Sequence, residues 1–180
     1  MLAGKSNIAF ASAEHDWQLS LPSGWSVLPK FPGEMKSGAP PLEVFAHPQD
    51  PALSMTWMRS MNPVGLRFWR QFEEATARPG LISPVLAHEL IFQVFPLLGR
   101  TVTAFVVILP DGSRALELTE EISDTNSCSE AMRGYHLLLP VKTTEQGPPY
   151  MQQIVFCARL SKFAQEIVEI IRAARSFRYY

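Results

Sequence analysis

The chain has 180 residues, of which 47% are hydrophobic and 18% charged, and its formal net charge at pH 7 is −1. This length and composition predict one folded domain over residues 1–180 with a sizeable core, and they exclude a disordered chain. The nearly balanced charge, without a cluster of basic residues, gives no reason to expect a nucleic acid or an anionic membrane as partner.

The first 14 residues are expected to form a flexible N-terminal arm or an ordinary strand. Ala11-Ser12-Ala13 resembles a signal-peptidase site, but the apolar run over residues 8–10 is far shorter than the roughly 7–15 residues of an export signal. No apolar stretch is long enough to span a membrane. We therefore expect a cytoplasmic protein in which Cys128 and Cys157 are free thiols, with a single disulfide between them as the alternative.

Alternating apolar and polar residues, separated by turn residues, predict strands along most of the chain. The predicted strands cover residues 17–21, 25–28, 42–46, 53–59, 85–87, 90–95, 102–109, 115–122, 133–141 and 151–158.

Turn chemistry suggests how neighbouring strands are joined. Pro22-Ser23-Gly24 is expected to connect the first two strands as a hairpin, and Asp111-Gly112 another pair further on. The nearly continuous apolar run over residues 102–109 indicates a central strand that is covered on both faces. Residues 29–41 are rich in proline and glycine and should form a loop.

Two segments have helical periodicity. Residues 65–77 place Leu66 and Phe72 on one stripe, and Pro79 ends the segment. The second helical segment closes the chain, with an apolar stripe from Phe163 to Phe177, and Ser161 is expected to cap its start. The order of elements is strands, helix, strands, helix, which is an α+β pattern. It predicts a largely antiparallel sheet covered by helices on both faces, an α/β/α sandwich.

The opening WQLSLPSGW at residues 17–25, the Asp111-Gly112 hairpin and the amphipathic close ending in Ser176-Phe177-Arg178 resemble the PsbP-like superfamily. That superfamily includes the extrinsic protein of photosystem II, the nuclear Mog-type Ran-binding proteins, the DcrB lipoproteins and the Eag chaperones of type VI secretion. The resemblance covers nearly the whole chain. It implies a sheet sandwiched by helices and a protein-binding, non-enzymatic role, but it transfers no set of functional residues, because the members share a fold and not a site.

The histidines offer little metal chemistry. His15 with Asp16, and His47 with Asp50, each combine an imidazole with a carboxylate. Neither pair has the spacing of a known metal motif. No Gly-x-Ser-x-Gly elbow, phosphate loop or dinucleotide fingerprint occurs in the sequence.

Two further candidates are weak. Cys157 with His88 or His136 would make a thiol–imidazole pair, but Cys157 lies in an apolar strand, where a thiol is expected to be a small core side chain. Glu120 and Glu121 point to opposite faces of a strand and are expected at a solvated edge. The sequence therefore predicts no catalytic residue, no cofactor and no metal site.

Methionine and aromatic side chains are concentrated on the predicted strand at residues 53–59 and the predicted helix at residues 65–77. Most of them should be core, and the rest would make an adaptable apolar groove for another protein, because Met and Trp are enriched at binding surfaces. The candidate partner-binding residues are Trp57, Met58, Met61, Phe68 and Trp69.

The sequence thus predicts a non-enzymatic protein-binding domain, an adaptor or a secretion-associated chaperone, and leaves its oligomeric state open. One alternative is a small-ligand carrier or an enzyme with a pocket between sheet and helix. Another is an immunity-type or scaffold protein that acts through its polar loops.

Overall fold

The computed structural model describes residues 8–12, 16–29, 42–50, 53–122, 131–141 and 148–179. His15, Cys128 and nearly all of the loop predicted at residues 29–41 lie outside these ranges. Ile8–Ala11 forms a strand, so this part of the predicted arm is built into a sheet. Within the described ranges, no helix combines the length and the apolar character that crossing a bilayer requires.

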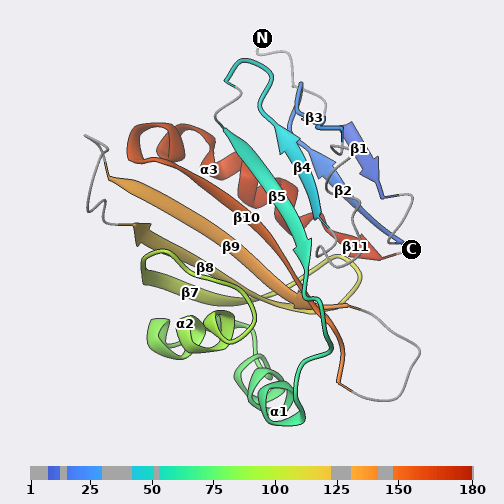
Figure 1. Ribbon diagram of the computed structural model, residues 1–180, viewed down its shortest axis with the longest axis vertical. Coiled ribbons are helices and arrows are strands. Elements are labelled where there is room, and N and C mark those ends of the chain that lie inside the picture. The colour runs from blue at the N-terminus through green and yellow to red at the C-terminus, as the bar shows by residue number, and fades with distance from the viewer. Residues whose placement is uncertain are drawn as a thin grey trace.

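The main sheet is antiparallel throughout its described strands (Figure 1). In spatial order it contains β3 (Ser26–Val27), β4 (Leu42–Ala46), β5 (Ser54–Arg59), β10 (Met151–Arg159), β9 (Met132–Pro140), β8 (Arg114–Ile122), β7 (Arg100–Ile108) and β6 (Gly80–Leu81). This arrangement confirms the predicted antiparallel sheet and the hairpin at Asp111-Gly112, where Gly112 has the positive φ of 82° that favours glycine.

A second, smaller sheet joins the two ends of the chain. It contains β1 (Ile8–Ala11), β2 (Trp17–Leu21) and β11 (Arg178–Tyr179), with β2 in the middle. The Trp17 ring packs between Trp57, at a centroid distance of 5.1 Å, and Phe177, at 5.3 Å. The opening strand and the close of the chain therefore share one aromatic core.

Helices cover both faces of the main sheet (Figure 1). They are α1 (Leu66–Ala75), α2 (Pro84–Phe92) and α3 (Leu160–Arg175). The protein has two hydrophobic cores, one on each face of the main sheet. Of two neighbouring residues of β9, Leu137 packs with α3 and the small sheet, and Leu138 packs with α1 and α2. Successive side chains of a strand point to opposite faces, so α3 lies on one face and the pair α1–α2 on the other. The predicted α+β class with helical cover on both faces is confirmed.

The strands predicted at residues 85–87 and 90–95 are wrong, because this segment contains helix α2. Ser83 is its N-cap and Pro84 occupies the first turn, where a missing N–H costs nothing. The sequence pattern resembles strands here because α2 is apolar around most of its circumference, and such a helix lacks a clear helical stripe.

Three smaller predictions also fail. Residues 25–28 do not form a hairpin with β2, because β1 and β11 occupy both edges of β2, and β3 pairs with β4 instead. β7 is not central, because among the described strands its outer edge pairs only with the two-residue strand β6. Ser161 is not the cap of α3, because the helix begins at Leu160 and places Ser161 within its first turn.

Candidate functional site

Helix α2 leaves an apolar surface uncovered. Its inner side buries Ala87, Leu90 and Ile91 in the core shared with α1. On the outer side, Val85 is 67% and Phe92 62% exposed. His88 and Glu89 are the only charged or titratable residues of α2, and a helix so rich in apolar residues is normally buried over most of its surface. The outer side of α2 is therefore a candidate contact surface for another molecule.

A groove runs beside this surface, between the start of α1 and the end of α2. Its first part has a volume of about 600 Å³ and includes Met61, Val64 and Phe68 in its lining. Arg67 and Gln93 line both this part and an adjoining hollow of about 510 Å³ that extends to Phe92. We call these two connected hollows the α1–α2 groove.

The five candidate partner-binding residues do not lie on one surface. Trp57 is only 1% exposed and faces the α3 side, where its indole N–H donates to Gln152 Oε1 at 2.9 Å. Phe68 is buried in the opposite core, while Met58 and Trp69 are half-buried beside it. Met61 is 58% exposed and lines the α1–α2 groove. Of the predicted set, Met61 is therefore the residue best placed to meet a partner.

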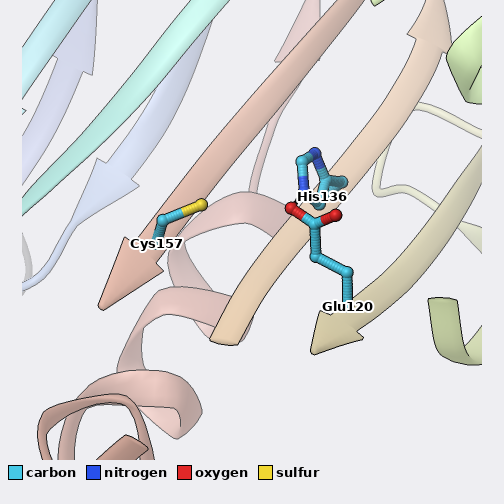
Figure 2. A group of neighbouring side chains, drawn as sticks. All are labelled: Glu120, His136 and Cys157. Atoms are coloured by element: carbon cyan, nitrogen blue, oxygen red, sulfur yellow. Dashed lines mark hydrogen bonds and ion pairs between the residues drawn. The ribbon is translucent and has the colours of Figure 1, made fainter. Parts of the chain in front are cut away.

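A second cluster lies within the main sheet. Figure 2 shows the side chains of Glu120, His136 and Cys157, which come from β8, β9 and β10. Their potential ligand atoms all lie within 4.8 Å of one another. Glu120 is fully buried, His136 is almost so and Cys157 is half-buried.

Strand register explains why these side chains meet. Glu120 and Cys157 are each paired with Gly134 of β9, so the three positions form one row across the sheet. His136 follows two residues after Gly134 and therefore points to the same face. A Cβ atom on Gly134 would lie 2.7 Å from Glu120 Cγ and Oε1, so glycine makes room for the carboxylate.

Hydrogen bonds hold the Glu120 carboxylate in place. His136 Nε2 lies 2.9 Å from Glu120 Oε1, and the Gly99 N–H donates to Oε2 at 2.9 Å. Burial by itself would raise the pKa of Glu120, but the bonds from His136 and from the backbone of Gly99 and Leu98 outweigh it and lower that pKa. Glu120 is therefore a charged carboxylate inside the sheet.

The thiol of Cys157 is poorly suited to nucleophilic catalysis. Burial, together with the negative charge of Glu120, raises the pKa of Cys157 to about 12. A thiol attacks as its thiolate, and this side chain remains protonated at neutral pH. His136 does lie beside Cys157, as the thiol–imidazole alternative requires, whereas His88 contacts Thr101 Oγ1 at 3.1 Å.

The sequence predicts that Glu120 and Glu121 both lie at a solvated edge. This is wrong for Glu120, which is buried, and Glu121 is partly exposed at the surface. The two side chains point to opposite faces, and Glu121 forms surface ion pairs with Arg133 at 2.8 Å and Arg100 at 3.1 Å. The period of two in Leu116, Leu118 and Glu120 could have placed Glu120 on a buried face. Nothing in the sequence identified Gly134 as its neighbour.

His47, which the sequence pairs with the carboxylate of Asp50, stabilises a local turn. His47 Nδ1 accepts hydrogen bonds from the backbone N–H groups of Gln49 and Asp50, at 3.2 and 3.1 Å. This nitrogen is occupied by the turn, and Asp50 contributes its backbone N–H to it. The structure thus gives His47 a structural role.

No protein-family model matches the sequence, and no curated protein matches it. Solved structures do. The cyanobacterial PsbP protein CyanoP of Synechocystis is 12% identical, with 99% of this chain and 95% of that chain covered and a TM-score of 0.50. The fold is PsbP-like.

A second match is LpqN of Mycobacterium tuberculosis, a protein involved in cell envelope biogenesis. It is 14% identical over 97% of this chain and 86% of that chain, with a TM-score of 0.48. At such identities a PsbP-like likeness concerns the fold, and it places no functional residue in this chain.

Proposed function

We propose that this chain is a non-enzymatic protein-binding domain whose α1–α2 groove and outer α2 surface receive an apolar segment of another protein. The observation that carries the proposal is the exposure of Val85 and Phe92 on a helix whose only charged or titratable residues are His88 and Glu89. Exposed apolar side chains that gather beside a groove commonly mark an interaction site.

The dimensions of the surface suggest the kind of segment that fits. Helix α2 has nine residues, which correspond to a length of about 13 Å. A partner helix of two to three turns, laid along α2 with its apolar side inward, would cover Val85 and Phe92 and reach Met61. Arg67 and Glu89, which both line the groove, have opposite charges, so the partner segment needs no strong net charge.

Binding is favoured over catalysis by the location of the titratable groups. His136 and Glu120 are buried within the sheet, and the histidine that lines the groove, His88, contacts Thr101 Oγ1 at 3.1 Å. A small-ligand carrier would need an enclosed pocket, whereas the volume next to α2 lies along the open surface between two helices. The remaining alternative is a scaffold or immunity-type protein that acts through its polar loops. No contact among the described residues supports that alternative.

The proposal is tested by selecting peptides from a displayed random library on the folded protein and measuring their affinity for two variants. Phe92→Asp places a charge in the centre of the surface. Val168→Asp is the matched control, because Val168 is 61% exposed on α3, on the other side of the sheet. We expect amphipathic peptides whose affinity falls at least about 30-fold in Phe92→Asp, as for a central interface residue, and stays unchanged in Val168→Asp.

Two results would overturn this assignment. One is a selection whose peptides bind both variants as well as the parent protein, which would place the binding surface elsewhere. The other is a concentration-dependent dimer, seen by light scattering, that Phe92→Asp abolishes. That result would show that a second copy of this chain covers the α2 surface, and a partner of another kind would no longer be needed.

A further inference from the structure

We propose that Glu120, His136 and Cys157 form a binding site for a thiophilic divalent transition-metal ion of the Zn²⁺ type. Three neighbouring strands deliver the three side chains to one face of the sheet, and register fixes them there (Figure 2). This inference rests on a different part of the molecule from the α1–α2 groove and is independent of the proposed function.

The ligand set selects the class of ion. A thiolate, an imidazole and a carboxylate suit Zn²⁺ and related transition metals, while Ca²⁺ and Mg²⁺ require sites made of oxygen atoms. Ligands about 2.0–2.3 Å from a tetrahedral ion lie roughly 3.3–3.8 Å from one another. The three ligand atoms are already within 4.8 Å, so side-chain movements of about 1 Å would bring them to bonding distance.

The surroundings of the cluster are prepared for such a site. Gly134, which has no side chain, lets the Glu120 carboxylate lie over β9, where a Cβ atom would come within 2.7 Å of it. The Gly99 N–H holds the second oxygen of Glu120 at 2.9 Å, and Gln153 Oε1 lies 3.5 Å from His136 Nδ1. Partners of this kind orient metal ligands and are a regular part of metal sites.

Charge balance also fits a divalent ion. The carboxylate of Glu120 and a thiolate at Cys157 carry two negative charges, which an ion of charge +2 neutralises within the buried cluster. On binding, the sulfur–metal bond replaces the S–H bond, and the thiol proton passes to solvent. Three protein ligands leave one position for water or an exchangeable ligand, and the half-buried Cys157 gives the ion access from the surface.

The test is a Co²⁺ titration of the chelator-treated folded protein in a Cys128→Ser background, which leaves Cys157 as the only thiol. We expect one Co²⁺ per chain, the visible bands of a tetrahedral ion and a thiolate-to-cobalt charge-transfer band, with Zn²⁺ displacing Co²⁺. Cys157→Ser should remove the charge-transfer band. It should also weaken binding by at least about 100-fold, because loss of a mere supporting partner already costs about 10–100-fold. The control His88→Asn, which alters a histidine outside the cluster, should bind as the parent protein does.

The absence of stoichiometric uptake would overturn the proposal, as would a charge-transfer band that survives Cys157→Ser or is lost in His88→Asn. If Cys157→Ser fails to fold, the proposal can still be tested by alkylation of Cys157 in the folded Cys128→Ser protein. Saturating Zn²⁺ should slow that alkylation more than tenfold, and an unchanged rate would exclude the site.

Discussion

Substitution Gly134→Ala should destabilise the protein because of one contact. The added Cβ would lie 2.7 Å from Glu120 Cγ and Oε1, whereas carbon atoms in contact prefer about 3.5–4.0 Å. Glu120 cannot move freely, since hydrogen bonds of 2.9 Å to His136 and to the Gly99 N–H hold both of its oxygens. Overpacking of this kind costs about 1–3 kcal/mol, and replacing glycine by alanine in a strand recovers about 0.5–1 kcal/mol. We expect a net loss of about 1–2 kcal/mol in the free energy of unfolding.

The assay is urea unfolding followed by tryptophan fluorescence, with a chelator present so that no metal ion contributes. With a slope of about 2 kcal/mol per M, the midpoint should fall by about 0.5–1 M. The same substitution is then made in a Glu120→Ala background, where the atoms that would collide are absent. There Gly134→Ala should be neutral or stabilising, giving a coupling energy of about 2 kcal/mol. An equal loss in both backgrounds would refute the steric reasoning.

Two further predictions concern the other face of the sheet and the thiol. Arg175→Met should lower the free energy of unfolding by about 2 kcal/mol, because it removes two 2.8 Å hydrogen bonds from the buried carboxylate of Glu117. The control Arg172→Met, which breaks only an exposed pair, should change it by less than about 0.5 kcal/mol, and equal losses in urea titrations would contradict this ranking. With its pKa raised to about 12, Cys157 should be about one part in 10⁴ thiolate at pH 8. Alkylation in the metal-free Cys128→Ser protein should therefore be at least about 100-fold slower when folded than in urea, and equal rates would disprove the burial argument.

Elements with a clear period were predictable from sequence alone. The closing helix follows the 3.6-residue repeat, with Phe163, Ile170 and Ala174 in one core. On β5, the alternation that sets Met55 and Trp57 against Ser54 and Thr56 matches their burial. Such patterns survive in the fold because each of these elements buries one side more deeply than the other.

The sites were less predictable, because their residues break a period or depend on partners far away in sequence. The sequence of α2 predicts strands because apolar residues lie around most of the helix. The same distribution leaves Val85 and Phe92 exposed and makes α2 the candidate binding surface. The sequence predicts a solvated edge for Glu120, because adjacent carboxylates in a strand point to opposite faces and cannot share a proton. Its partner His136 lies 16 residues away, on the neighbouring strand.

The sequence by itself determined which segments alternate, where tight turns fall and that the chain ends in an amphipathic helix, because these properties depend on neighbouring residues. The tertiary structure alone decided that β2 leaves its predicted hairpin for a second sheet, that one side of α2 remains uncovered and that Gly134 brings Glu120, His136 and Cys157 together. Strand order and register are set by competition among distant segments for the same edges and faces, and no local pattern encodes the outcome.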